Sequence, residues 1–562
     1  MKTNKFIVIL SMLILVIGLN SCSEDYLTKY PIDKPASSTF LKSEAELELA
    51  VVGVYQRLWA GHGGYSLPFE IMLDCTTDIA WERADAQWQE LGNGKVDPNN
   101  WVLGNMWTTM YDGIQRCNFI IQNVNRLENI KDQERVDQNI AQARFLRAYW
   151  YHHLIEMFGD VPLVTTLLDL DEAYIAKTSK EVIYEFLLKE LEECSEILPL
   201  KYTASGDIGK AAKGAALALK ANVALYAGKW DIATDAAKRV MELGVYQLES
   251  TYENLYIKSK QDVSKEIIFQ ISFLKGTRNH SFPGGVNTRM GRGYSSKVPN
   301  QALIDSYLCT DGLPIDQSPL YNPLKPFENR DPRMYETCVV PGMIFAGFQF
   351  ESHKDSLLCW NYNVTPARRV ANQDATNPYA TFSGYCWKKY TNLEDPEYLD
   401  RSNTAFLLLR YGEVLLTYAE AKIEANDIDK SVYDAINAIR GRAGMPTVDE
   451  NAGLSQAQLR TIVRTERKIE LALEGKRLYD IRRWKIAEKV LPGNLLGRIS
   501  KGLLANAPEI DENGSPSYDN VTNKADMRVI EVRLFDTAKN YLWPIPQIET
   551  NVNSNLIQNE GY

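Results

Sequence analysis

Apolar side chains that recur at intervals of three and four residues constrain the fold of this chain more than any other feature. One such run, in WTTMYDGIQRCNFIIQNVNRL, comprises Trp107, Met110, Tyr111, Ile114, Cys117, Ile120, Ile121 and Val124. Because residues at this spacing share one face of an α-helix, the run predicts a buried helix with Trp107 in the core. Further helices are predicted over 134–158, 180–197, 211–227 and 230–243.

Small residues indicate where two of these helices approach each other closely. The stretch KGAALALKANVALYAGKWDIATDAAKRVMELG resembles a tetratricopeptide-type hairpin of two antiparallel helices. A second pair is predicted in LLLRYGEVLLTYAEAKIEAND and SVYDAINAIRGRAG, about 160 residues further on, and another helix over 455–474. The sequence therefore predicts a mainly α fold in which helical hairpins form a scaffold.

The segment between the two helical pairs, about 261–405, differs in kind. It is dense in Gly, Pro, Asn and aromatic residues, and only short pieces such as EIIFQISF look like strands. Long irregular loops on a helical scaffold are where binding residues usually lie. We therefore expect ligand contacts in this region.

The N-terminus predicts export. Lys2 and Lys5 precede an apolar run over Phe6–Leu19, which is too short for a membrane span and fits a signal peptide over 1–21. Cys22 follows at the cleavage point, as in a bacterial lipobox. We expect Cys22 to be acylated and to anchor the protein to a membrane. Each methylene buried in the bilayer contributes about 0.8 kcal/mol, so several acyl chains give stable membrane attachment where a single chain does not.

The residues after Cys22 predict a tether and a cellular location. The segment 22–45 is expected to be a lipidated tether, rich in Pro, Ser and Thr over about 26–39. Ser23-Glu24-Asp25 resembles the acidic tag of lipoproteins that face the exterior of the outer membrane. We therefore expect a lipid-anchored protein of the outer membrane that faces the cell exterior.

Charge and composition exclude several classes of protein. The chain has 62 basic and 72 acidic residues, a net charge of −10, and removal of 1–21 takes away two further lysines. Nucleic acid is therefore not an expected partner. Apart from Cys22, the cysteines are seven, scattered and without a CxxC pair, and the five histidines are dispersed. We expect no disulfide framework, metal site or cofactor.

Six blocks follow one another in a fixed order along the chain. They are ARFLRAYWYHHLIEMFGDVPLV, ALIDSYLCTDGLPI, FENRDPRM, RYGEVLLTYAEAK, TERKIELALEGKRLYDIRRW and the ending YLWPIP…NSNLIQNEGY. Together they resemble the SusD/RagB family of outer-membrane lipoproteins. The resemblance covers nearly the whole chain. It implies surface capture of a nutrient, usually a glycan, and its delivery to a SusC-like TonB-dependent barrel in the same membrane.

The resemblance also implies a division of the chain. A SusD-like N-terminal helical region would cover 46–260, and a SusD/RagB C-terminal region 261–562. Within the second region we expect loops over 261–405, helices over 406–490, and a C-terminal loop and tail over 491–562.

Charged residues within these blocks are interpreted as structural. Alternating Arg and Glu on closely packed helices usually form interhelical ion pairs. The residues concerned are Arg144, Arg147, Arg330, Arg333, Glu413, Glu420, Glu466, Glu470 and Arg477. They are expected to stabilise the helical scaffold, and they do not indicate which ligand is bound.

A glycan site should combine aromatic faces, on which sugar rings pack, with polar partners for the hydroxyls. In this family the site is typically an arc drawn from loops after the first helices and from the central segment. The resemblance therefore suggests Trp81, Trp88 and Tyr294 as platforms. The candidate polar partners are Arg83, Asp85, Asn99, Asn100, Arg292 and Asn361, and Trp101 and Trp360 are secondary aromatic candidates.

Each platform has an alternative interpretation. The stretch AWERADAQW could be one helix that buries Trp81 and Trp88 on a single face. Trp101 follows Pro98-Asn99-Asn100 and could staple the start of the next helix. Tyr294 lies among glycines and serines, where exposure is expected.

Two alternative functions remain open. The same architecture could bind peptides, although the tryptophan-rich loop favours sugars. A secreted glycoside hydrolase would need two carboxylates about 5–10 Å apart across a sugar site. Candidates for these are Glu70, Asp74, Asp78, Glu82 and Asp85. Because no nucleophile motif accompanies them, we expect a binding protein and not an enzyme.

Overall fold

The computed structural model describes residues 40–59 and 68–562. The predicted signal peptide, Cys22 and most of the predicted tether lie outside the described residues. No described helix is long and apolar enough to cross a bilayer.

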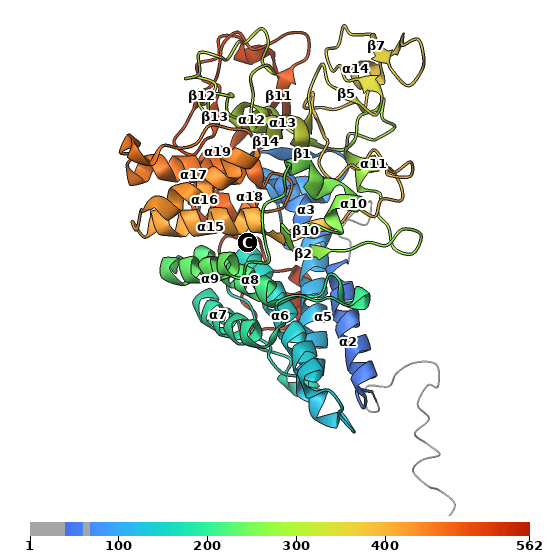
Figure 1. Cartoon of the computed structure of the whole chain (residues 1–562), viewed down its shortest axis with the longest axis vertical. Coiled ribbons are helices and arrows are strands. Elements are labelled where there is room, and N and C mark those ends of the chain that lie inside the picture. Colours follow the sequence, from blue (N-terminus) through green and yellow to red (C-terminus); the bar gives the residue numbers. More distant parts are fainter. Residues whose placement is uncertain (1–39, 60–67) are drawn as a thin grey trace, which may run out of the picture.

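Long helices form one side of the molecule (Figure 1). Their bounds are α2 Glu44–Leu58, α5 Trp101–Asn123, α6 Gln133–Phe158, α7 Lys180–Ile197, α8 Lys213–Tyr226, α9 Trp230–Glu242, α15 Tyr411–Glu424, α16 Lys430–Arg442 and α17 Gln456–Glu470. Consecutive helices from α5 to α9 pack against each other, and α15 packs on α9, α16 and α17. The two helical pairs, far apart in the sequence, therefore stack continuously in space. The predicted mainly α fold with tetratricopeptide-type hairpins is confirmed.

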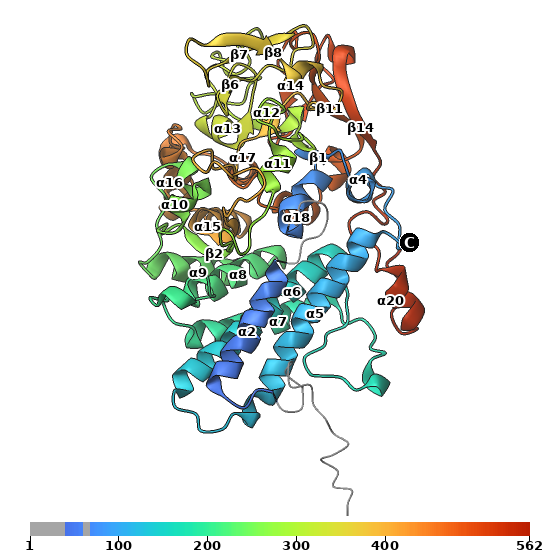
Figure 2. The ribbon, with the colours of Figure 1, turned by 90° about the vertical axis from the view of Figure 1, so that its right-hand side faces the viewer.

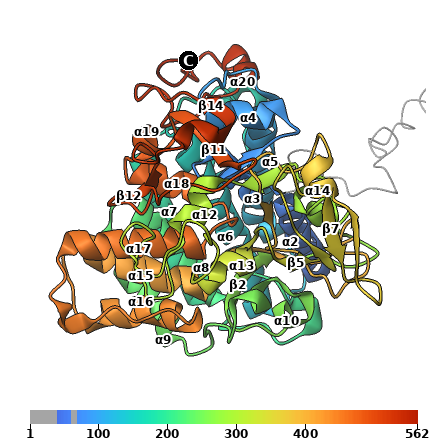
Figure 3. The same ribbon diagram turned by 90° about the horizontal axis from the view of Figure 1, so that it is seen from above.

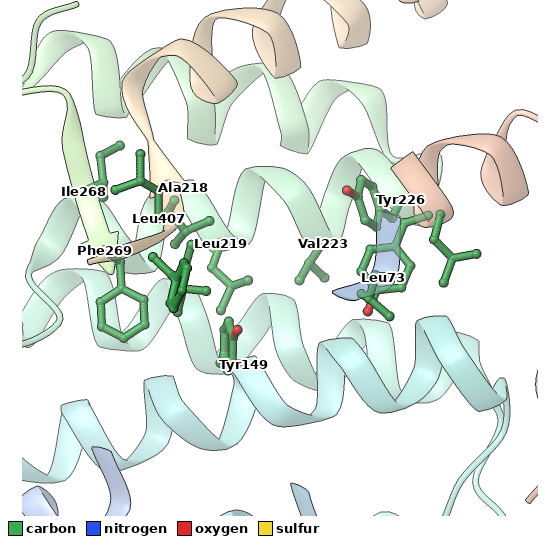
Figure 4. Packing of buried hydrophobic residues seen from close by; sticks show 14 of the residues in the cluster. Leu73, Tyr149, Ala218, Leu219, Val223, Tyr226, Ile268, Phe269 and Leu407 are labelled. Carbon is green, nitrogen blue, oxygen red and sulfur yellow. The ribbon is translucent and has the colours of Figure 1, made fainter. Parts of the chain in front are cut away.

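Small side chains let α8 pack in the middle of this stack. All its residues after Lys213 are buried, because α7, α9 and α15 contact it from different sides. In Figure 4, Leu219 lies beside the buried Tyr149 of α6, and Val223 and Tyr226 follow further along α8. Five of the eight residues of the predicted stripe are buried, Tyr111, Ile121 and Val124 are partly buried, and Val124 lies just beyond α5. Trp107 is 4% exposed, so its assignment to the core is confirmed.

Most of the remaining chain forms short helices and small antiparallel sheets at the other end of the molecule, whereas β2 (Ile267–Ile271) lies against α8 and α20 (Gln547–Val552) near the start of α5 (Figure 2). The sheets pair β1 Ala80–Glu82 with β3 Lys297–Pro299, β2 Ile267–Ile271 with β10 Phe406–Arg410, β4 Cys338–Val339 with β9 Cys386–Trp387, β11 Gly493–Ile499 with β14 Met527–Arg533, and β12 Glu509–Ile510 with β13 Pro516–Ser517. A four-stranded sheet contains β5 Ile344–Phe345, β6 Phe348–Gln349, β7 Leu358–Asn361 and β8 Arg368–Ala371.

Short helices fill the space between these sheets. They are α3 Phe69–Leu73, α4 Ala86–Asn93, α10 Lys258–Gln261, α11 Phe282–Val286, α12 Gln301–Ser306, α13 Pro332–Thr337, α14 Gln373–Thr376, α18 Arg477–Arg483, α19 Ala487–Val490 and α20 Gln547–Val552. Seen from above, α15, α16 and α17 lie on one side and the β7–β8 hairpin on the other (Figure 3). The loop-rich region thus extends away from the helical stack.

Buried ion pairs join the two parts. Arg410 contacts Glu266 at 2.9 Å and Glu470 at 2.7 Å, and Arg333 contacts Glu466 at 2.9 Å, all of them buried. The other predicted pairs connect Arg144 and Arg147 to Glu190, Glu413 to Lys476, Glu420 to Arg483, and Arg477 to Asp78. The structural interpretation of these residues is confirmed.

Arg330 is the exception among the nine charged residues. Its guanidinium donates to the carbonyl oxygens of Pro326, Ile304 and Tyr307, and makes no ion pair with any carboxylate of the described chain. It is still structural, because it satisfies buried backbone groups around α12. The seven described cysteines are buried free thiols.

Candidate functional site

The two tryptophans that the sequence suggested as sugar platforms are buried. Trp88 is 1% exposed and belongs to the main core, while Trp81 is 6% exposed and packs with Val298 and Leu495. The single helix considered for AWERADAQW is also wrong, because Trp81 lies in β1 and Trp88 in α4. Neither indole presents a face on which a sugar could stack, so the suggestion is wrong for both.

Tyr294 is 49% exposed, as its glycine-rich setting predicted. A closed network of backbone hydrogen bonds holds its loop: the Tyr294 N–H donates to Gly284 O at 2.7 Å, and Gly293 N–H to Thr288 O at 2.8 Å. A side chain at position 293 would not fit, since a Cβ there would lie 2.5 Å from Asn287 O. The loop therefore presents Tyr294 on a fixed backbone.

The pairing of β1 with β3 brings Arg83 beside Tyr294, 211 residues away in sequence. Arg83 N–H donates to Ser296 O at 2.7 Å, and its Nη2 donates to Tyr294 O at 3.1 Å. Its guanidinium carbon lies 5.4 Å from the ring centroid of Tyr379 and 5.8 Å from that of Phe382. Arg83 thus links three aromatic residues.

Two further arginines complete this cluster. Arg289 donates from Nη2 to Tyr379 O at 2.7 Å and lies 5.8 Å from the ring of Tyr294, and Arg528 lies 4.2 Å from the ring of Phe382. Tyr379 is 61% exposed, and Phe382 is partly exposed. We name the set of Tyr294, Tyr379, Phe382, Arg83, Arg289 and Arg528 the aromatic–arginine surface.

Trp81 supports this surface from below. Its ring centroid lies 5.6 Å from that of Phe382, at an interplanar angle of 51°. The sequence suggested Trp81 as an exposed platform, but Phe382 packs over it and takes the outer position.

The structure separates the other residues of the first loop from this surface. Asp85 accepts from Gln87 N–H as the N-cap of α4, and Asn100 accepts from Val102 N–H as the N-cap of α5. Asn99 and Trp101 are exposed, the latter at 45%, so Trp101 begins α5 without being buried against it. Asp85 and Asn100 thus serve the helix ends.

A second pair of exposed rings lies on the β7–β8 hairpin. The centroids of Trp360 and Tyr362 are 6.4 Å apart, and the Arg369 guanidinium lies 5.6 Å from the Trp360 ring. Asn361, between the two rings, accepts from Asn363 N–H. Arg292 is exposed and adopts a φ of 68°, at the turn before Tyr294.

Sequence reasoning missed Tyr379, Phe382, Arg289, Arg528 and Tyr362. The stretch NPYATFSG does contain two aromatic residues among turn-forming and small residues, which could have indicated exposed rings. Nothing local connects it to Tyr294 or Arg83, because the contacts are long-range.

The carboxylates considered for glycoside hydrolysis are occupied in the structure. Glu82 pairs with Lys297 at 2.6 Å, Asp78 pairs with Arg477 at 2.7 Å, and Asp74 accepts from Leu473 N–H at 2.6 Å. Glu70 accepts from the Tyr149 hydroxyl, and burial raises its pKa to about 7. All four are buried, so they do not face an exposed sugar site.

An open cavity of about 1090 Å³ lies among the C-terminal loops and the 322–356 segment. Leu324, Glu351, His353, Arg498 and Leu503 are among its lining residues, and no Trp, Tyr or Phe lines it. The rings of the aromatic–arginine surface thus lie outside this cavity.

Comparisons with known proteins identify the family. Residues 265–562 match the model of the SusD family, and residues 25–225 match one described as starch-binding and associating with the outer membrane. A SusD-like protein P2 of Formosa agariphila is 25% identical, over 98% of this chain and 99% of its own length.

Solved structures agree with these matches. A SusD-like carbohydrate-binding protein of Bacteroides fragilis is 30% identical, with a TM-score of 0.80, and the match covers 92% of this chain and 100% of that one. A laminarin-binding SusD-like protein, 20% identical with a TM-score of 0.67 over 93% of this chain and 100% of its own, shares the fold. The chain therefore belongs to the SusD/RagB family, whose role is carbohydrate binding in association with the outer membrane.

Proposed function

We propose that this protein is a cell-surface, non-catalytic glycan-binding lipoprotein that captures oligosaccharide or polysaccharide and delivers it to a SusC-like TonB-dependent transporter. The observation that carries the proposal is the aromatic–arginine surface. Exposed Tyr294 and Tyr379 offer faces for the C–H patches of sugar rings, and the guanidinium of Arg83 beside them offers donors to hydroxyls.

Binding without catalysis fits the chemistry of the surface. The six side chains that define it are aromatic rings and guanidiniums and include no carboxylate, whereas most glycoside hydrolases use a pair of carboxylates. The nearby Glu82 is occupied by Lys297. Release to a transporter requires only modest affinity, because a slow dissociation rate would hold the glycan back.

The attachment to the membrane rests on the sequence. Acylation of Cys22 would tether the body to the outer membrane with its surface toward the exterior. The N-terminal peptide of the protein, isolated from membranes and analysed by mass spectrometry, should begin at Cys22 and carry acyl chains; an unmodified N-terminus would contradict the anchor.

Glycan binding is tested by affinity electrophoresis of the mature protein with Cys22→Ser in gels that contain plant, fungal or host polysaccharides. We expect retardation by at least one polymer, no release of reducing ends, and loss of retardation in the double variant Tyr294→Ala/Tyr379→Ala. Tyr174→Ala is the matched control, since Tyr174 is 52% exposed in the loop between α6 and α7. Unchanged retardation of the double variant would contradict the proposed site.

Delivery is tested separately, by affinity purification of the tagged protein from detergent-solubilised outer membranes. A TonB-dependent barrel should co-purify in comparable amount. Its absence, with the lipoprotein intact and membrane-bound, would contradict the proposed partner and leave glycan binding standing.

A further inference from the structure

Two arginines of the aromatic–arginine surface and a neighbouring lysine have no carboxylate partner among the described residues. Within residues 40–59 and 68–562, Arg83, Arg528 and the neighbouring Lys354 have no carboxylate oxygen within 4.0 Å, while Arg410, Arg333 and many others pair with one or more. The chain has 72 acidic residues, so the lack of partners here is a matter of position and not of composition.

These cations lie close together along the segment 375–382. Lys354 Nζ donates to Ala375 O at 2.8 Å, Arg289 Nη2 to Tyr379 O at 2.7 Å, and the Arg528 guanidinium lies 4.2 Å from the Phe382 ring. Lys354 and Arg528 are near enough that burial and then the charge of Arg528 lower the pKa of Lys354. Like charges are thus held together at this surface.

The hydrogen-bonding capacity of two guanidiniums is mostly unused. The side chain of Arg528 makes no hydrogen bond to any described residue, although a guanidinium has five N–H donors. Arg83 uses Nη2 for Tyr294 O, while its buried Nε has no partner among those same residues. The guanidinium of Arg528 is partly exposed, so its N–H donors are open to acceptors on a ligand.

Three carboxylates close in sequence to these residues or their neighbours have other partners. Asp374 is 1% exposed and accepts from the backbone N–H groups of Arg289 and Met290, and burial raises its pKa to about 6. Glu82 pairs with Lys297, and Glu531 pairs with Arg533 at 2.7 Å. None of these carboxylates neutralises Arg83 or Arg528.

A sugar polymer with acidic groups matches this arrangement. Carboxylates and sulfates accept paired hydrogen bonds from a planar guanidinium, and such charge-assisted bonds are about twice as strong as neutral ones. Building on the proposed function, we infer that the ligand is an anionic polysaccharide: its uronate carboxylates or sulfate esters pair with Arg83, Arg289 and Arg528, while its rings pack on Tyr294, Tyr379 and Phe382.

The test compares polymers that differ only in charge. Binding is measured by isothermal titration calorimetry with polygalacturonate against its methyl ester, and with carrageenan against its desulfated form. Laminarin and dextran are neutral references. We expect binding to one charged polymer at least tenfold tighter than to its neutral partner, with affinity that falls as NaCl is raised from 50 to 500 mM. The preferred pair distinguishes a uronate from a sulfate ligand.

Charge variants locate the effect. The variant Arg83→Gln/Arg289→Gln/Arg528→Gln should lose at least tenfold in affinity, and Arg528→Gln alone at least threefold without a change in Tm, because its guanidinium makes no internal hydrogen bond. The control is Lys189→Gln/Lys238→Gln/Lys430→Gln, which removes three exposed charges on α7, α9 and α16. It should change affinity less than twofold.

The outcomes separate the two proposals. Binding of neutral polymers as tight as that of charged ones, or charged-polymer binding that Arg528→Gln leaves unchanged, would overturn the anionic ligand and leave glycan binding standing. Failure to bind any polymer of this panel would overturn the anionic ligand, and failure in the affinity gels as well would overturn glycan binding.

Discussion

Replacing Trp88 by Ala separates a core role from a sugar-binding role. A tryptophan buries roughly 150–250 Å², and Trp88 is 1% exposed in the main core. At about 25 cal/mol per Å² the lost transfer free energy is about 4–6 kcal/mol, an upper value, and measured truncations of this kind cost about 3–5 kcal/mol. We therefore expect Trp88→Ala to lower the free energy of unfolding by about 4 kcal/mol.

Urea denaturation followed by circular dichroism measures this change, with Tyr294→Ala as the comparison. Because Tyr294 is half exposed, its truncation should cost about 1 kcal/mol or less, yet it should weaken glycan binding at least tenfold. Trp88→Ala should bind glycan normally under conditions where it is folded. A stable Trp88→Ala protein that no longer binds glycan would refute the assignment of this side chain to the core.

Two other predictions concern single sites. Burial raises the pKa of Glu70 from 4.5 to about 7, so the folded state keeps a proton that the unfolded state releases, and stability falls as pH rises through this window. The difference in unfolding free energy between wild type and Glu70→Gln should therefore change by about 3 kcal/mol from pH 4 to pH 8; the exposed control Glu242→Gln should show no such change, and a flat profile for Glu70→Gln would contradict the raised pKa. Gly293→Ala should displace Tyr294, because the added Cβ would meet the Asn287 backbone at 2.5 Å. It should weaken glycan binding at least tenfold in affinity gels, whereas Gly104→Ala, with open space at its Cβ, should not; normal binding by Gly293→Ala would contradict the fixed loop.

The helical scaffold could be predicted because its signal is local. The stripe that contains Trp107 repeats within one helix, and the small residues of α8 report close packing of its neighbours. The predicted boundaries of α6 and α7 agree with the structure within one residue. Amphipathic helices longer than ten residues carry enough periods to be recognised from sequence.

The region around Trp81 could not be predicted in the same way. β1 forms because it pairs with β3, more than 200 residues away, and Asp85 then caps a new helix. A strand of three residues has no periodicity of its own, so AWERADAQW looked like one helix. The alternative interpretation is therefore correct that both tryptophans are buried, but wrong that they share one face of a single helix.

The residues of the candidate site could be predicted only in part, because long-range contacts bring them together. Tyr294 could be identified from its glycine-rich loop, whereas Tyr379 and Arg528 join it only through tertiary contacts. That no carboxylate of the described residues pairs with Arg528 is likewise a property of the folded chain, and composition gives no indication of it.

The packing of α9 on α15 has a consequence for how this protein can be divided. The first family match ends at residue 225 and the second begins at residue 265, which suggests two interchangeable modules. Yet α15 packs on both α8 and α9 within one apolar core, and Arg477 forms a buried ion pair with Asp78 across either boundary. A fragment from either side would expose part of the apolar core, and it would leave either Arg477 or Asp78 without its ion-pair partner. New ligand specificity is therefore gained by exchanging surface loops within one indivisible body, and chimaeras should be built at the loops and not at residue 225 or 265.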